Sequence, residues 1–134
     1  MAHEAVREIC DSLPARYSPK LSDQITFLLG RIEPLVSRGL YNCEISFDKI
    51  PLQLISVRDA DREATAEDGY PQLQRDLLSF DYDSVPIACG RQGERTAVWD
   101  GHHRLRTYEL AGRGYIPALV ATFVRGYGLV TVRR

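Results

Sequence analysis

The side chains best suited to chemistry lie together in the stretch 98-VWDGHHRLRTYELAG-112, where two adjacent histidines stand between Gly101 and Arg104. The apolar run before Asp100 is typical of a strand, and the residues after Gly101 are typical of a helix. A helix start presents backbone N–H groups and a partial positive charge, which suit an anion such as phosphate. Gly101 would let the backbone approach a ligand closely, and Arg104 supplies donors that match phosphate oxygens.

The other polar residues of this stretch have more than one interpretation. His102 and His103 would add donors or a general acid–base group. Asp100 would repel a phosphate unless a cation such as Mg²⁺ lay between them, and its alternative role is that of a helix N-cap. Adjacent histidines point in different directions on a helix, so a zinc site that uses both is not expected. Arg104 is equally consistent with a solvated helix face, and residue chemistry alone leaves both interpretations open.

Strands and a helix must position this stretch. The β-branched and aromatic content predicts four strands, over residues 44–57, 84–90, 96–101 and 115–124. Pro51 is expected to break the first of them. A helix over 103–111 is expected to stop at Gly112 and Gly114, and residues 126–134 add an edge strand or a tail.

Helices are also predicted in the first part of the chain and before the second strand. They span residues 3–13, the segment from Ser18 to Gly39, and a short segment after Pro71. In the second of these, one face carries the apolar residues Leu21, Ile25, Leu28, Ile32 and Leu35. The order of elements predicts an α+β fold, with a small mixed sheet flanked by helices, over residues 44–134. Residues 1–43 form an N-terminal helical extension.

Composition bounds the class of protein. The chain has 134 residues, which fit one domain, and its net charge of -1 does not favour nucleic-acid binding by the molecule as a whole. Cys10, Cys43 and Cys89 are scattered and show no metal-binding spacing. No signal peptide and no apolar run long enough to span a bilayer is visible. We therefore expect a cytoplasmic protein without membrane partners.

The stretch VWDGHHRLRTYELAGRGYIPALV resembles the signature of the ParB/sulfiredoxin superfamily. In that signature a strand ends in a short glycine-containing turn, followed by His-Arg or Arg-Arg, a helix, a glycine and a strand like Ile-Pro-Ala-Leu-Val. EISFDKIPL resembles the family's first strand, and the segment from LLSFDY to VPIAC resembles its helix and following strand. The resemblance covers about residues 44–124, and DGHHR is its specific part. It implies that the turn and helix start hold the phosphates of a nucleoside triphosphate or diphosphate.

The activities of this superfamily divide, and the residues favour one branch. The resemblance to sulfiredoxins is weak, because Gly101 stands where their reactive cysteine precedes His-Arg, and Cys89 is expected in the core. A partition protein is not expected either, because a helix-turn-helix domain would have to follow and the chain ends at Arg134. The DGHHR form resembles most closely the kinases of free serine, which use ATP and Mg²⁺.

The resemblance therefore predicts transfer or hydrolysis of the γ-phosphate of ATP or a related nucleotide, with a small hydroxyl-bearing molecule or water as acceptor. Asp100 is the expected metal-linked carboxylate. Gly101, His102, His103 and Arg104 form the phosphate cradle, and one histidine doubles as acid–base group. The loop 58-RDADRE-63 offers Glu63, Asp61 and Asp59, of which Glu63 or Asp61 is the expected base, and Arg58 or Arg62 would add a second contact to the nucleotide.

The alternative function is a non-catalytic, nucleotide-switched DNA-binding or regulatory module. In that case the N-terminal helices would mediate homodimerisation or contact with a partner. The basic residues near the C-terminus, Arg125, Arg133 and Arg134, are few, which does not favour DNA.

Overall fold

A six-stranded mixed β-sheet organises the protein in a computed structural model that describes residues 7–8, 28, 30–57, 75 and 86–133. The strands follow the spatial order β2-β4-β3-β5-β1-β6. Their bounds are β1 Tyr41–Pro51, β2 Ile55–Ser56, β3 Ile87–Gln92, β4 Arg95–Asp100, β5 Tyr115–Arg125 and β6 Val130–Val132. A 3-10 turn, η2 (Leu52–Leu54), follows β1, and one helix, α5 (His102–Leu110), joins β4 to β5.

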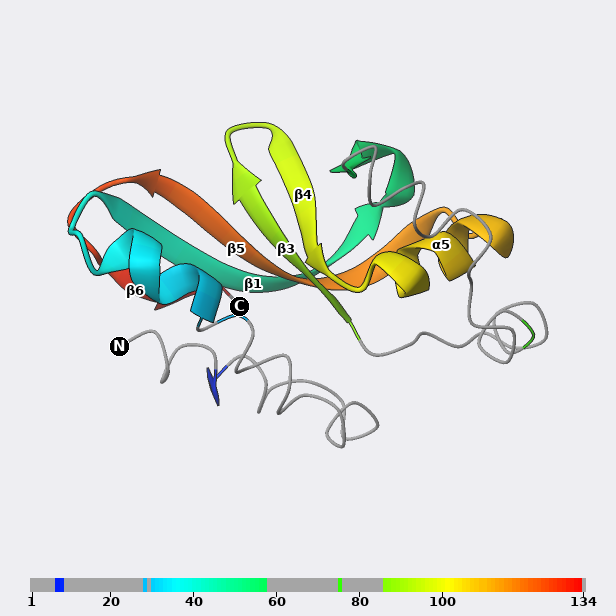
Figure 1. Cartoon of the computed structure of the whole chain (residues 1–134), viewed down its shortest axis with the longest axis horizontal. Coiled ribbons are helices and arrows are strands. Elements are labelled where there is room, and N and C mark those ends of the chain that lie inside the picture. The colour runs from blue at the N-terminus through cyan, green and yellow to red at the C-terminus, as the bar shows by residue number, and fades with distance from the viewer. Residues whose placement is uncertain (1–6, 9–27, 29, 58–74, 76–85, 134) are drawn as a thin grey trace.

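The antiparallel pair of β1 and β5 is the longest pairing in the sheet (Figure 1). All 11 residues of β1 have partners in β5, from Tyr41 opposite Arg125 to Pro51 opposite Tyr115. β3 runs parallel to β5 and pairs with β4 in an antiparallel hairpin. β6 adds a short parallel edge to β1, and β2 adds a parallel edge to β4. The other four strands are built on this long pairing: β6 adds to β1, and β3, β4 and β2 follow in turn from β5.

Two separate cores lie on opposite faces of this sheet, because successive side chains of a strand alternate between its faces. In β5, Leu119, Ala121 and Phe123 belong to one core. Ile116, Ala118 and Val120 belong to the other. The first core is completed by Leu28, Ile32 and Val36, and the second by Leu105 and Tyr108 of α5.

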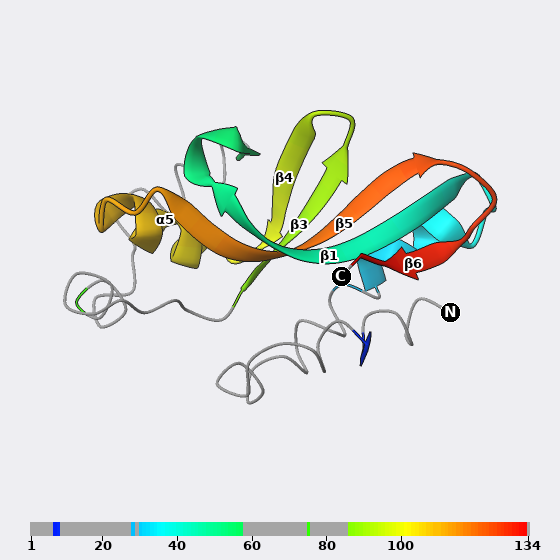
Figure 2. The same ribbon diagram turned by 180° about the vertical axis from the view of Figure 1, so that it is seen from behind.

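The two helical segments therefore cover opposite faces of the sheet, and they also lie at opposite ends of it (Figures 1 and 2). Residues 30–36 are helical and lie near β6, whereas α5 lies at the far end of β5. The helical segment is also tied to β4, because the guanidinium of Arg31 lies 5.8 Å from the ring centroid of Trp99.

The observed strands confirm the sequence prediction closely. β1, η2 and β2 reproduce the strand with a break at Pro51, and β6 shows that the last segment contains an edge strand. The helix expected over 103–111 is α5, which starts one residue earlier, at His102. The structure is α+β with a mixed sheet, as expected.

Among the N-terminal predictions, the helix from Ser18 to Gly39 is confirmed where it is described, at residues 28 and 30–36. The placement of Leu35 on the apolar face is wrong, because its side chain is 39% exposed and Val36 is buried instead. Steps of four residues from Leu28 lead through Ile32 to Val36, which places Leu35 off the buried face. The predicted helices over 3–13 and after Pro71 lie almost wholly outside the described residues.

Over the part of the chain that the structure describes, none of the helices has the length and apolar character that crossing a membrane requires.

The helical segment should contribute strongly to stability through its buried face. Ile32→Ala removes a fully buried side chain and should lower the free energy of unfolding by about 2–5 kcal/mol through lost burial and the cavity left behind. Urea denaturation measures this. Leu35→Ala is the matched control on the same helix and should change stability by less than about 1 kcal/mol. Equal losses in the two variants would contradict the packing described here.

Candidate functional site

The site predicted from the sequence lies where β4 passes into α5. β4 ends at Asp100, Gly101 is the N-cap of α5, and no side chain caps the helix at that position. The N–H of Leu105 donates to the carbonyl oxygen of Gly101 at 2.9 Å, which closes the first helical turn. The alternative that Asp100 acts as the N-cap is therefore wrong, because Gly101 takes that position in the left-handed conformation, with φ of +106°.

Gly101 is also in close contact with the sheet. A Cβ atom at this position would lie 2.5 Å from Cγ2 of Ile87, the first residue of β3. Ile87 is fully buried in the core beneath α5. Two independent features thus require glycine here: its positive φ and the contact with Ile87. The start of α5 is held directly against the start of β3.

Arg104 forms a second link between the same two elements. Its Nη1 donates to the carbonyl oxygen of Pro86 at 3.0 Å, and its Nη2 lies 3.5 Å from Oδ2 of Asp100. The side chain of Arg104 is 18% exposed, whereas that of Asp100 is 44% exposed. The carbonyl group of Pro86 and the carboxylate of Asp100 therefore help to fix the guanidinium beside the helix start. Its location is as predicted, and its bonds to the protein were not foreseen.

His102 and His103 are the first two residues of α5, and both are partly buried. Consecutive residues on a helix are separated by about 100° around its axis, so the two imidazoles point in different directions. The carbonyl oxygen of His103 accepts a hydrogen bond from the hydroxyl of Thr107 at 2.7 Å. Among the described residues, no three histidine, cysteine, aspartate or glutamate side chains gather into a group that could hold a metal ion.

The structure thus brings together the residues of the DGHHR stretch. Asp100 and Arg104 are in contact, and Gly101, His102 and His103 lie between them at the helix start. The remaining predicted site residues, Arg58, Asp61 and Glu63, lie outside the described residues.

One feature beside α5 was not foreseen from the sequence. A pocket of about 290 Å³ lies beside the helix and is lined by Leu52, Gln53, Ile55, Leu105 and Glu109. Leu52, Ile55 and Leu105 line part of it, and the polar groups of Gln53 and Glu109 line the rest. Residues of η2 and β2 meet α5 here. Because these residues lie about 50 positions from α5 in the sequence, no local sequence pattern could have indicated the pocket.

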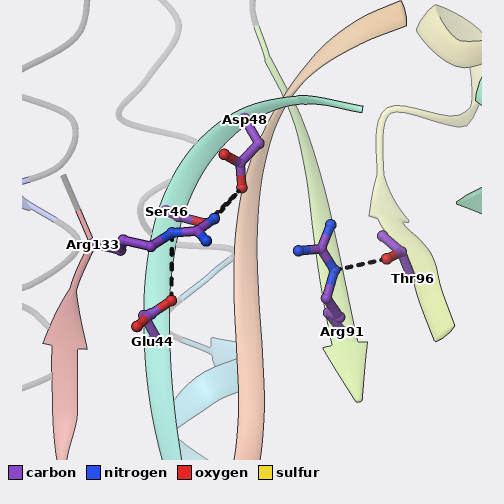
Figure 3. Close-up of polar contacts among 6 residues, drawn as sticks. All are labelled: Glu44, Ser46, Asp48, Arg91, Thr96 and Arg133. Atoms are coloured by element: carbon purple, nitrogen blue, oxygen red, sulfur yellow. Dashed lines mark hydrogen bonds and ion pairs between the residues drawn. The ribbon is translucent and has the colours of Figure 1, made fainter. Parts of the chain in front are cut away.

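A polar cluster on the sheet was also missed (Figure 3). Arg133 donates from Nη2 to Oδ2 of Asp48 at 2.7 Å, and its Nε lies 3.5 Å from Oε1 of Glu44. Ser46, between these two carboxylates on β1, donates from its hydroxyl to Asp48. Arg133 was considered for a basic surface near the C-terminus. Its charge is instead offset by two carboxylates, which fasten the residue after β6 to β1.

The two described cysteines are core residues. Cys43 and Cys89 are buried and free of disulfide bonds. Burial raises the pKa of the Cys89 thiol from 9.0 to about 12, although the nearby Arg91 acts in the opposite direction. Burial, with a smaller effect of Glu44, raises the pKa of Cys43 to about 12 as well. The expectation that Cys89 belongs to the core is confirmed.

Comparison with known proteins assigns no family to the chain. No protein-family model matches it, and no curated protein matches it significantly. The resemblance to the ParB/sulfiredoxin superfamily therefore rests on the DGHHR stretch and the two segments quoted with it.

Substitution of Gly101 should be costly. Gly101→Ala forces an L residue into a positive φ and places its Cβ against Ile87. It should lower the free energy of unfolding by about 2–4 kcal/mol, the combined effect of backbone strain and overpacking, measured by urea denaturation. Gly114→Ala is the control, since a Cβ there meets nothing within 4 Å. A Gly101→Ala variant as stable as that control would contradict the described helix start.

The raised thiol pKa values predict inert cysteines. At pH 8.5, Cys43 and Cys89 should remain protonated in the folded protein and resist alkylation by iodoacetamide, because the thiolate is the reactive form. Both should react within minutes in urea, where their pKa values return to the ordinary range. Peptide mapping by mass spectrometry distinguishes them from Cys10. Rapid native labelling of Cys89 would contradict its placement in the core.

Proposed function

We propose that the chain is a nucleotide-binding protein of the ParB/sulfiredoxin type that transfers or hydrolyses the γ-phosphate of ATP or a related nucleotide. The observation that carries this proposal is the start of α5, where a helix capped by Gly101 carries no side-chain cap and has an arginine one turn away. The first N–H groups of a helix have no partner within the helix, and its N-terminal end attracts negative charge. A phosphate group satisfies both.

Arg104 is the proposed phosphate contact with the best-defined geometry. Its hydrogen bond to Pro86 fixes the guanidinium at the helix start before any ligand binds, which lowers the entropic cost of binding. The Nη2 group that faces Asp100 would turn to a phosphate oxygen, because the present separation of 3.5 Å is long for a charge-assisted bond. His102 and His103 would donate further hydrogen bonds, and one of them would move a proton during transfer.

Asp100 fits the role of a magnesium ligand. Its carboxylate is 44% exposed and lies at the same helix start. Mg²⁺ is commonly held by one or two carboxylates together with phosphate oxygens and water, so Asp100 could supply the protein's share. The ion would neutralise charge on the phosphates. Without it, Asp100 would oppose phosphate binding, and this requirement makes magnesium part of the proposal.

The proposed acceptor is a small hydroxyl-bearing molecule or water. The pocket of about 290 Å³ beside α5 would hold such a molecule, with Gln53 and Glu109 as the polar groups that could contact its hydroxyl. Glu63 or Asp61 is the proposed base, and Arg58 the second nucleotide contact. Residues 44–134 are the proposed ParB/sulfiredoxin-like nucleotide-binding domain, and residues 1–43 are the proposed N-terminal helical extension. The proposed location is the cytoplasm.

One observation favours the second candidate function, a non-catalytic switch. Arg104 connects α5 to the residue before β3, so a phosphate that displaced this bond would alter the packing between two elements. Such a rearrangement is how a nucleotide would control a DNA-binding or dimerising surface. Release of ADP from ATP in the presence of Mg²⁺ distinguishes an enzyme from a switch that only binds.

Nucleotide binding should be visible as a thermal shift. ATP, ADP, CTP and GTP are compared with and without Mg²⁺, and at a concentration 100 times Kd a ligand stabilises the folded state by about 2.7 kcal/mol. We expect at least one nucleotide to raise Tm by several degrees in a magnesium-dependent manner. Arg104→Gln should abolish the increase, because the phosphate contact is lost.

Arg104→Gln also removes the bond to Pro86, so the ligand-induced change in Tm is compared within each variant. Arg95→Gln is the matched control, since it makes the same charge change on an exposed strand end and should keep the full shift. If no nucleotide stabilises the wild type, the phosphate site does not exist.

A further inference from the structure

The C-terminal end of α5 is closed by backbone hydrogen bonds and a glycine. The N–H of Arg113 donates to the carbonyl oxygen of Tyr108 at 3.0 Å, and that of Gly112 to Glu109 at 3.1 Å. With Gly112 at a φ of +71°, these bonds form a Schellman motif. The motif usually brings together apolar side chains at the positions of Arg113 and Tyr108. Here the guanidinium of Arg113 lies 5.8 Å from the ring centroid of the buried Tyr108.

Beside this helix end lies a pocket of about 420 Å³ lined by Lys49, Arg113, Gly114 and Tyr115. Lys49 comes from β1, and Tyr115 is the first residue of β5. Pro51 pairs with Tyr115 in the β1–β5 register, so Lys49, two residues earlier, is a diagonal neighbour of Tyr115 on the same face. The β1–β5 strand pair and the helix end thus converge on one concave site.

The lining has the chemistry of an anion site. Arg113 is oriented by the Schellman motif and by the ring of Tyr108, so its planar fork of donors is partly preorganised. Lys49 adds a second cation, and the phenol of Tyr115, whose residue is 58% exposed, adds a donor and an aromatic face. A volume of about 420 Å³ accommodates a small organic molecule.

We infer that this pocket binds a small organic oxyanion, a phosphate monoester or a carboxylate, with its charge between Lys49 and Arg113 and its apolar part against Tyr115. The site is distinct from the helix start, because the nine residues of α5 separate the two ends by roughly 14 Å. It therefore does not depend on the proposed nucleotide site, and it would hold an effector or a second substrate group.

The test uses the full chain labelled with ¹⁵N and titrated with phenyl phosphate or benzoate. We expect saturable shifts of the backbone amide signals of Gly114 and Tyr115 with at least one of these probes, and the probe that binds identifies phosphate or carboxylate as the preferred group. Lys49→Gln and Arg113→Gln should each weaken this binding roughly ten-fold or more, as loss of a charged hydrogen-bonding partner implies. Added NaCl should weaken it as well.

Arg125→Gln is the matched control, since it removes a positive charge from the exposed opposite end of β5 and should leave the titration unchanged. Because Arg113 belongs to the helix end, its variant is accompanied by Lys49→Gln, which alters an exposed strand residue. Shifts that do not saturate, or that persist unchanged in Lys49→Gln, overturn the inference. Signals of Gly101 and His102 report separately on the helix start, so failure of one site is distinguished from failure of the other.

Discussion

The register between β1 and β5 is the constraint on which the rest of the structure depends. Eleven consecutive residue pairs fix these strands relative to one another, and a slip of one residue would exchange their two faces. Leu119, Ala121 and Phe123 would then turn away from the helical segment at residues 28 and 30–36, and Ile116, Ala118 and Val120 away from α5. Because both faces of β5 must bury their own apolar residues, only one register between β1 and β5 satisfies both cores. This pairing also positions β3, on which the start of α5 rests.

The start of α5 combines structural and proposed chemical roles in the same residues. Gly101 fits against Ile87, and Arg104 reaches the carbonyl group before β3. These contacts are sufficient reason for a glycine and an arginine at those positions without any ligand. They equally hold the helix start and the guanidinium in fixed positions, which is what a phosphate site requires. The proposed function therefore rests on the geometry and charge of the helix start, and nucleotide binding decides whether the arrangement has a use beyond folding.

The sequence predicted elements well and contacts less well, for a physical reason. Alternation, Pro51 and Gly112 are local signals, so the strand break and the end of α5 followed from residue types. Asp100 and Gly101 are both plausible N-caps, and the choice depends on backbone angles that neighbouring residues do not reveal. The bonds from Arg104 to Pro86 and from Arg133 to Asp48 join residues 18 and 85 positions apart. Contacts between residues so far apart in the sequence depend on the order and register of the strands, which local patterns do not indicate.

The diagonal placement of the two helical segments has a consequence for communication within the molecule. Residues 30–36 lie near β6 on one face, and α5 lies at the far end on the other (Figure 1). In the part of the chain described, a displacement of α5 would reach the opposite core through the strands, since β5 contributes alternate residues to both. β5 is thus the element that both cores share, so a substitution that shifted its backbone would disturb the packing on both faces of the sheet.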